Sequence, residues 1–446
     1  MPAEPTPADA MAVDPPAAKE ATPVDPVVVV KNDLKAAVVS IDRFVSTREP
    51  RFIAAALRVA DQLRVLEKKE GCGGQGATLV SVFLSQGLPL AHPLRDTLLG
   101  YLSPLATPLT ATDDEKKEDE KKRPLGPEAE MFGLLLVLLL LIDAKRFEES
   151  LACATALVER LSTWNRRTMD PVAERVYFYA SWAYECAGKL QEFRSRLLAA
   201  HRTACLHHNT SCQATTLNLL LRNYLHYKLF DQADKLLTKA TFPEQSSNTQ
   251  LARFLYYNGR IKALQLEYTE AHRCLQQASR KAPQTKALGF RLTVAKLGTI
   301  VQLLLGEIPE RAIFRARQSR APMQPYLKLV QSVRLGDLTA FKVAMEAHAE
   351  TFAKDGNYTL VMRLRQNVIR AGLRNISLAY SRISLTDVAA KLHLDNVEDM
   401  EPIAAKAIRD GVIDATLDHS QGVLLSQESH DVYSTLEPQA AFHKRI

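Results

Sequence analysis

The sequence predicts a mainly α protein: a right-handed, TPR-like helical solenoid followed by a C-terminal winged helix that carries a small β-hairpin. Three observations predict this class. Apolar residues recur at helical spacing along most of the 446 residues. A loose repeat of helix pairs runs through the middle of the chain, and two short helix signals near the C-terminus precede two runs of strand-forming residues.

The first part of the chain divides into a tail, a helical region and a loop. Residues 1–30 are rich in Pro and Ala and lack the basic and apolar regions of a secretory signal, so we expect a disordered tail. Residues 31–112 are an expected helical region. Residues 113–128 mix both charge signs without an apolar stripe and are an expected flexible loop. The apolar positions that predict the helices are Leu34, Val38, Val39, Ile41, Ile53, Leu57, Ala60, Leu63 and Leu66.

The run LLLVLLLLI, Leu134 to Ile142, is the one stretch that suggests a membrane. It stops at Asp143, whereas spanning a bilayer takes about 20 apolar residues. We therefore expect a helix that is buried on all sides.

Residues 129–283 carry the repeat, whose best copy is YYNGRIKALQLEYTEAHRCLQQASRKAP. In this copy Gly259 lies where the first helix needs a small residue, and Pro283 ends the second helix. Leu266 departs from the Gly usual at its position, while Ala271 and Ala278 permit close helix approach. The aromatic or aliphatic turn positions, separated by 43, 40 and 38 residues, are Phe147, Leu190, Phe230 and Tyr268.

Residues 284–380 continue as helix-turn-helix units with Gly306, Gly336 and Gly356 at their ends, so the solenoid is expected to run on without a linker. A long helix, TLVMRLRQNVIRAGLRNISLAY, then leads into the winged helix at residues 381–428. Residues 429–446 are expected to be the start of a C-terminal helical segment that the chain truncates.

The winged helix is predicted from its caps and its alternation. Ser384 is an expected N-cap, and Leu385, Val388, Ala389 and Leu392 are the expected buried face of a first helix. A second helix is expected to start at Asp395 and Glu398, with Val397, Ile403, Ala404 and Ile408 as its apolar positions. VIDATLD and VLLSQ are expected strands joined by a turn that contains Gly422.

The charge of the second helix favours a protein partner over DNA. Its N-terminal end carries Asp395, Glu398, Asp399 and Glu401, which would repel phosphate, and Lys406 and Arg409 come only in its last turn. We therefore expect the hairpin to offer an edge strand to another protein. The alternative is that the wing merely caps the solenoid. The candidate protein-binding residues are Ile413, Ala415, Leu417, Val423 and Leu424.

Charge and cysteine content give limited information about partners and compartment. A net charge of +7 and a pI near 9.0 point only weakly to anionic partners. Thinly spread cysteines indicate reduced thiols, and hence the cytoplasm or nucleus. The six are Cys72, Cys153, Cys186, Cys205, Cys212 and Cys274.

Two motifs resemble binding sites, but neither has the context that such a site needs. GCGGQG, Gly71 to Gly76, fits a dinucleotide fingerprint but follows an amphipathic helix instead of a strand, so we expect an inter-helix loop. CLHHNTSC, Cys205 to Cys212, has no common zinc spacing. No P-loop or H-E-x-x-H motif is present, and Cys205 has no local signature of a nucleophile. We expect no catalytic residue, cofactor or metal.

A helical solenoid that runs into a winged helix resembles the PCI family of the proteasome lid, the signalosome and a translation initiation factor. FLYYNGRIKALQLEYTEAHRCLQQASRKAPQ, LLLGEIPERAIF, DGNYTLVMRLRQNVIRAGLRNISLAYSRISLTDVAAKL and AKAIRDGVIDA are most similar to the proteasome's non-ATPase regulatory subunit 3 family. The resemblance implies a non-catalytic lid subunit that serves ATP-dependent degradation of ubiquitinated proteins. Its winged helix would join a horseshoe of PCI subunits, and a C-terminal helix would join a bundle.

The resemblance also implies partners: other lid subunits in a hetero-oligomer, with no small-molecule substrate and no membrane. Two alternatives remain, a subunit of another PCI complex and a nucleic-acid-binding winged-helix protein. An enzyme is a more distant third, which loss of turnover on changing Cys205 to Ala would reveal.

Overall fold

The computed structural model describes residues 26–68, 74–88, 92–105, 126–243, 245–284, 287–394, 398–426 and 435–445. The chain divides into two compact units, residues 1–199 and 200–446, and the boundary falls within α8 (Leu190–Leu206). Of the expected loop at residues 113–128, residues 113–125 lie outside the described residues, as does the tail up to residue 25. The end of that loop is helical instead, because α5 begins at Pro127.

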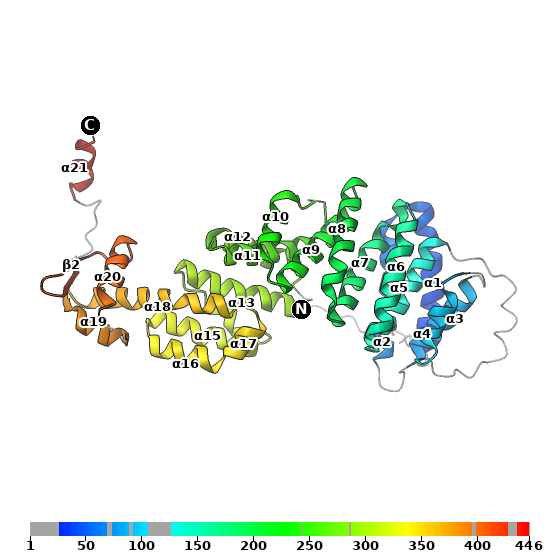
Figure 1. Cartoon of the computed structure of the whole chain (residues 1–446), viewed down its shortest axis with the longest axis horizontal. Coiled ribbons are helices and arrows are strands. Elements are labelled where there is room, and N and C mark those ends of the chain that lie inside the picture. Colours follow the sequence, from blue (N-terminus) through cyan, green and yellow to red (C-terminus); the bar gives the residue numbers. More distant parts are fainter. Residues whose placement is uncertain are drawn as a thin grey trace, which may run out of the picture. The chain divides into compact units, whose positions relative to one another are not determined.

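The described part of unit 1 is helical (Figure 1). α1 begins at Pro26, so residues 26–30, which we expected in the tail, are helical. The reason is that Val30 is buried and extends the apolar stripe of Leu34, Ala37 and Ile41 by one turn. The elements are α1 (Pro26–Thr47), α2 (Pro50–Glu67), α3 (Gln75–Gly87), α4 (Arg95–Leu102), α5 (Pro127–Asp143), α6 (Phe147–Thr163), a 3-10 turn (Arg167–Met169) and α7 (Asp170–Cys186).

The leucine run forms α5, which is buried along its length, as predicted. The helix ends at Asp143, a half-buried carboxylate whose charge is compensated by a neighbouring helix. Asp143 accepts hydrogen bonds from Arg64 of α2, at 2.6 Å to Nε and 2.9 Å to Nη2. Burial raises the pKa of the Asp143 carboxyl, but the hydrogen bonds and positive charges of Arg64 and Lys68 together outweigh burial and lower the pKa.

Unit 2 continues the helix pairs and ends in a small sheet. Its elements are α9 (Thr210–His226), α10 (Phe230–Lys239), α11 (Asn248–Leu264), α12 (Tyr268–Lys281), α13 (Leu288–Leu305), α14 (Ala312–Arg315), α15 (Arg320–Leu335), α16 (Leu338–Ala347), α17 (Ala349–Lys354), α18 (Tyr358–Ala379), β1 (Arg382–Ser384), α19 (Leu385–Leu392), α20 (Met400–Arg409), β2 (Ala415–Asp418), β3 (Val423–Ser426) and α21 (Glu437–His443). α13, α15, α16 and α18 pack together ahead of the winged helix (Figure 1).

Each predicted turn position of the repeat begins the second helix of a pair: Phe147, Leu190, Phe230 and Tyr268 open α6, α8, α10 and α12. Two residues before each of them, the backbone enters the left-handed region. The four residues there, with their φ angles, are Lys145 (60°), Gly188 (73°), Lys228 (57°) and Leu266 (76°). The repeat is therefore regular in its backbone, although only one copy has the Gly that this conformation favours.

Gly259 explains how closely α11 and α12 pack. A Cβ at this position would lie 3.0 Å from Leu275 Cγ and 3.3 Å from the Ala271 carbonyl oxygen. Ala271 and Ala278 are fully buried on the facing helix. The small residues predicted from the repeat thus lie at the contact between the two helices.

A second close approach joins α15 to α18. Gly336 ends α15 with φ +74°, and a Cβ there would lie 2.4 Å from Gly372 Cα. Asn367 and Asn375 on α18 donate side-chain hydrogen bonds to the ends of the neighbouring helices, at 2.6 Å to Leu303 O and 3.2 Å to Leu335 O. These contacts hold α18, which leads directly into β1.

By length and composition, one helix among the described residues, α13, could cross a membrane. Its buried residues Val294, Leu297, Ile300 and Leu303 belong to the same hydrophobic core as α15, α18 and the winged helix. The helix is 33% buried, so α13 contributes one face to that core.

Candidate protein-docking edge of the winged helix

The winged helix closes a three-stranded antiparallel sheet in the order β1, β3, β2. The hairpin of β2 and β3 is the one predicted from the sequence, whereas β1, the short strand Arg382–Ser384, was not predicted. Its three residues alternate exposed, buried and half-buried, a pattern too short to separate from a helix start. Because β3 lies in the middle, β2 forms one edge of the sheet.

The start of α19 is fixed by side-chain and backbone caps. Ser384 accepts a hydrogen bond from the Asp387 N–H at 3.1 Å, as its predicted N-cap role requires. The Leu385 N–H donates to the Gly422 carbonyl at 2.9 Å, which ties the helix to the wing. Leu385, Val388, Ala389 and Leu392 are all buried, as predicted.

The wing turn is held by Asp418. Its Oδ1 accepts from the Ser420 hydroxyl at 2.6 Å and from the Ser420 N–H at 3.0 Å. The hydroxyl bond in particular lowers the pKa of the Asp418 carboxyl. His419 at the tip lies 2.6 Å, Nδ1 to Oε1, from Glu401 of α20, so the wing also contacts the second helix.

The structure places the five candidate docking residues mostly inside the protein. Ile413, Ala415 and Leu424 are buried, and Leu417 and Val423 are half-buried. Leu424 of β3 pairs with Leu417 on one side and Ile383 on the other, and this row faces the core. The side chains of Ile413, Ala415, Leu417 and Leu424 pack into the chain's own core, whereas Val423 lies on the opposite face of β3. A partner would therefore meet the backbone at this edge more than these side chains.

The hydrogen-bond pattern shows which backbone groups lie on the edge. Ser426 N–H donates to Ser381 O, and Gly422 O accepts from Leu385 N–H, each at 2.9 Å. Even-numbered residues of β3 therefore direct their backbone groups toward β1. Because these directions alternate along a strand, Val423 and Leu425 direct theirs toward β2.

Thr416 pairs with Leu425, and Asp418 pairs with Val423. These two are therefore the hydrogen-bonded pairs of the β2–β3 ladder. The backbone groups of Ala415 and Leu417 then point away from β3. Within the described residues, β2 pairs with β3 alone. Ala415 and Leu417 thus present an unpaired N–H and C=O row, which is the geometry that strand addition uses.

The outer face of the sheet carries residues that sequence analysis did not select. Arg382, Leu425 and Thr416 form one cross-strand row and are all exposed. The sequence does indicate this outer row. Side chains alternate between the two faces of a strand, so if Ala415 and Leu417 face the core, Thr416 between them faces outward. This row and the β2 edge are the accessible parts of the sheet.

The second helix differs from its predicted start. α20 begins at Met400, Glu398 and Asp399 precede it in a turn, and Asp395 and Val397 lie outside the described residues. Pro402 fits the first helical turn, where its missing N–H costs nothing. Glu401 lies in the first turn, with Lys406 and Arg409 in the last, so the acidic end expected to repel phosphate is present.

Of the glycine motif, residues 71–73 lie outside the described residues, while Gly74 to Gly76 open α3 and bind a carboxylate. Glu67, at the end of α2, accepts hydrogen bonds from Gly74 N–H at 2.8 Å and Gly76 N–H at 3.1 Å. The preceding element is a helix, as expected. A phosphate approaching the N-terminus of α3 would meet this negative charge, which disfavours a dinucleotide site.

The cysteine and histidine motif does not form a metal site in the described residues, where no group of three or more possible ligands occurs. Cys212 is buried in the first turn of α9, and its N–H donates to the Asn209 side chain at 3.1 Å. Cys205 lies 3.7 Å, Sγ to Nε2, from His201. Partial burial raises the pKa of the Cys205 thiol, which disfavours the thiolate that a nucleophile needs.

Comparison with known proteins matches both parts of this architecture. A family model described as PSMD3-like, N-terminal TPR repeats, matches residues 26–330, and a PCI domain model matches residues 345–428. A probable 26S proteasome non-ATPase regulatory subunit 3 of Nicotiana tabacum is 48% identical over 90% of this chain and 81% of its own length. Homolog A of Arabidopsis thaliana is 46% identical over 93% and 84%, and the Dictyostelium discoideum subunit 45% identical over 93% and 82%.

Proposed function

This chain belongs to the 26S proteasome non-ATPase regulatory subunit 3 family, and from that membership we propose that it is a non-catalytic lid subunit that scaffolds the regulatory particle. In this role it holds other subunits in place for ATP-dependent degradation of ubiquitinated proteins. Its partners are other proteasome subunits in a hetero-oligomer, and its compartments are the cytoplasm and the nucleus.

The observation that carries the docking part of the proposal is the open edge of β2. Ala415 is buried and Leu417 half-buried, while their backbone groups point outward. A neighbouring winged helix would extend the sheet through main-chain hydrogen bonds. Nucleic acid fits less well, because the acidic start of α20 occupies the position where a DNA reader needs basic or amide side chains.

Two variants at one position test the edge. Ala415→Pro removes the outward N–H, and Pro is tolerated at the first residue of an edge strand. Ala415→Val adds volume at the same buried site but keeps the N–H. Each N-terminally tagged chain is expressed in cells, and mass spectrometry quantifies the lid subunits that co-purify at moderate salt.

We expect the original chain and the Val variant to recover the other subunits, and the Pro variant to lose them while its helical content is unchanged. Equal recovery with both variants would exclude docking through the Ala415 N–H. Equal loss of the other subunits with both variants would mean that disturbed packing at Ala415, and not the missing N–H, prevents docking. Recovery of signalosome or initiation-factor subunits by the original chain would replace the proteasome with another PCI complex.

A further inference from the structure

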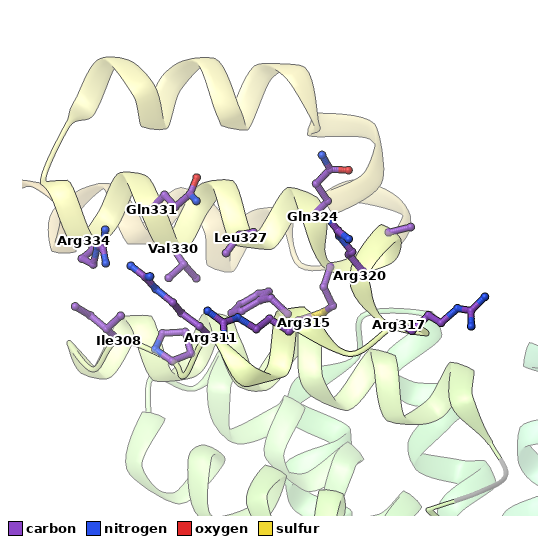
Figure 2. A pocket seen from close by; sticks show the side chains of 14 residues that line it. Ile308, Arg311, Arg315, Arg317, Arg320, Gln324, Leu327, Val330, Gln331 and Arg334 are labelled. Atoms are coloured by element: carbon purple, nitrogen blue, oxygen red, sulfur yellow. The ribbon is translucent and has the colours of Figure 1, made fainter.

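A groove of about 950 Å³ lies in unit 2 between α15 and the segment that connects α13 to it. Its floor is apolar: Phe314, Met323 and Val330 are buried, and Leu327 is half-buried. Gln324 and Gln331 on α15 provide neutral polar groups along its wall (Figure 2). The site is separate from the β2 edge and has no part in the docking described above.

The rim of the groove is strongly basic. Five arginines line it, and all are exposed. Among the residues that the structure describes, no Asp or Glu lines the groove. Within the described part of the chain, none of the five has an ion pair or a side-chain hydrogen bond. They are Arg311, Arg315, Arg317, Arg320 and Arg334.

The arginines are not equivalent. Figure 2 shows Arg311 and Arg315 lying along the groove over its apolar floor, with Arg334 at one end and Arg320 at the other. Arg317 points away from the rest. Guanidinium groups stay charged at any pH the protein meets, so Arg311, Arg315 and Arg334 repel one another until an anion lies between them.

We propose that this groove binds a phosphorylated peptide segment of a partner protein. The phosphate would lie on Arg311, Arg315 and Arg334, and an apolar side chain next to the phosphorylated residue would lie on Leu327 and Val330. A phosphate group carries a charge of about −1.5 to −2 and three acceptor oxygens, which suits several guanidinium groups at once. A carboxylate has two oxygens, and one arginine fork satisfies it.

The same surface suits nucleic acid less well. Single strands bind through aromatic side chains on which bases stack, in addition to positive charge. The one aromatic residue that lines the groove, Phe314, is only 6% exposed and serves as floor. A free phosphate ion, in turn, would leave the apolar floor uncovered.

The test uses the full chain, immobilised, and three libraries of short peptides with random flanking residues. The central residue is phosphoserine in one library, Glu in the second and Ser in the third. A fluorescently labelled single-stranded oligonucleotide is the fourth probe. Bound peptides are identified by mass spectrometry, and the affinity of the best phosphopeptide is measured by fluorescence polarisation.

We expect enrichment from the phosphoserine library, with apolar residues selected beside the phosphoserine. Replacing phosphoserine by Ser in the best peptide should weaken binding at least about tenfold, because the charge-assisted bonds are lost. The double variant Arg311→Gln and Arg315→Gln should lose binding by a similar factor. Arg317→Gln, which removes one positive charge from an arginine that points away, should bind as the original chain does.

Four outcomes would overturn the proposal. Equal enrichment from the Glu library would mean a site for acidic peptides in general, and tighter binding of the oligonucleotide would mean a nucleic-acid site. An equal loss of phosphopeptide binding in the Arg317 and Arg311/Arg315 variants would mean that overall positive charge, and not the groove, determines binding. If the phosphoserine library is not enriched over the Ser library, and far-UV circular dichroism shows that the chain is folded, the groove does not bind phosphopeptides.

Discussion

Gly336 and Gly306 form a matched pair for testing whether close packing holds the winged helix to the solenoid. Both end a helix in the left-handed conformation, with φ +74° and +92°, and the N–H of each is bonded to the preceding turn. They differ in their surroundings. A Cβ on Gly306 meets nothing within 4 Å, whereas a Cβ on Gly336 would lie 2.4 Å and 2.5 Å from Gly372 Cα and N.

The expected costs follow from that difference. In Gly306→Ala the left-handed conformation costs about 1–2 kcal/mol, offset by roughly 0.5–1 kcal/mol because Ala loses less backbone entropy than Gly on folding. Gly336→Ala carries the same terms and must also move one backbone against another, since Gly372 has no side chain that could rotate away. Overpacking of this kind costs typically about 1–3 kcal/mol more. We therefore expect Gly336→Ala to be less stable than Gly306→Ala by about 2 kcal/mol.

Hydrogen exchange with mass spectrometry on the full chain measures the effect where it arises. Amides of α15 and α18 should open more readily in the Gly336 variant, and those of α13 only slightly more readily in the Gly306 variant. Urea unfolding followed by far-UV circular dichroism gives the global change. A difference between the two variants below about 0.5 kcal/mol would refute the claim that this contact is tight.

Two further predictions concern single positions. Leu266→Gly should stabilise the chain by about 0.5–1 kcal/mol, because Leu266 is exposed and held at φ +76°. Leu378→Gly, at an exposed but helical position of α18, should destabilise the chain by a similar amount, and urea unfolding of both variants measures the two changes. Asp337→Ala should cost about 1 kcal/mol at neutral pH, because Asp337 caps α16 through the Thr339 and Ala340 N–H groups. The hydrogen bond from the Thr339 hydroxyl is the largest cause that lowers the pKa of Asp337, so its contribution is present above the ordinary Asp pKa and lost as pH falls through the lowered value. The Asp337→Ala deficit should therefore shrink in acid, and an unchanged deficit in thermal melts at low pH would contradict this assignment.

Strong local patterns made much of the fold predictable. The leucine run predicted α5, and the repeat predicted where four second helices begin, because both signals repeat many times along the sequence. The left-handed residues of the turns were hidden, since Lys145, Lys228 and Leu266 carry no chemical mark of that conformation. Tertiary packing imposes it, and propensity alone does not show it.

The candidate site was less predictable. Apolar residues of the wing indicated a sheet, but apolar character alone does not say whether a side chain faces a partner or the chain's own core. Pairing with β1, which was too short to detect, determines that Leu424 faces inward. The basic groove had a signal in RAIFRARQSR, residues 311–320, which carries four arginines without an acidic residue. The depth of the groove depends on the position of α15, which the sequence does not reveal.

The contact between Gly336 and Gly372 also has a mechanical consequence. α18 is held by α15 on one flank and continues without a break into β1, and Arg370 on the same helix pairs with Asp410 at the end of α20, 2.6 Å from Nη2 to Oδ2. The winged helix is therefore packed directly against α18 and follows it after two residues, without a long linker. A force applied to the sheet by a bound partner would act on α18 and, through its contacts, on α15 and α13. Force applied at the winged helix would thus be transmitted to the helices that precede it.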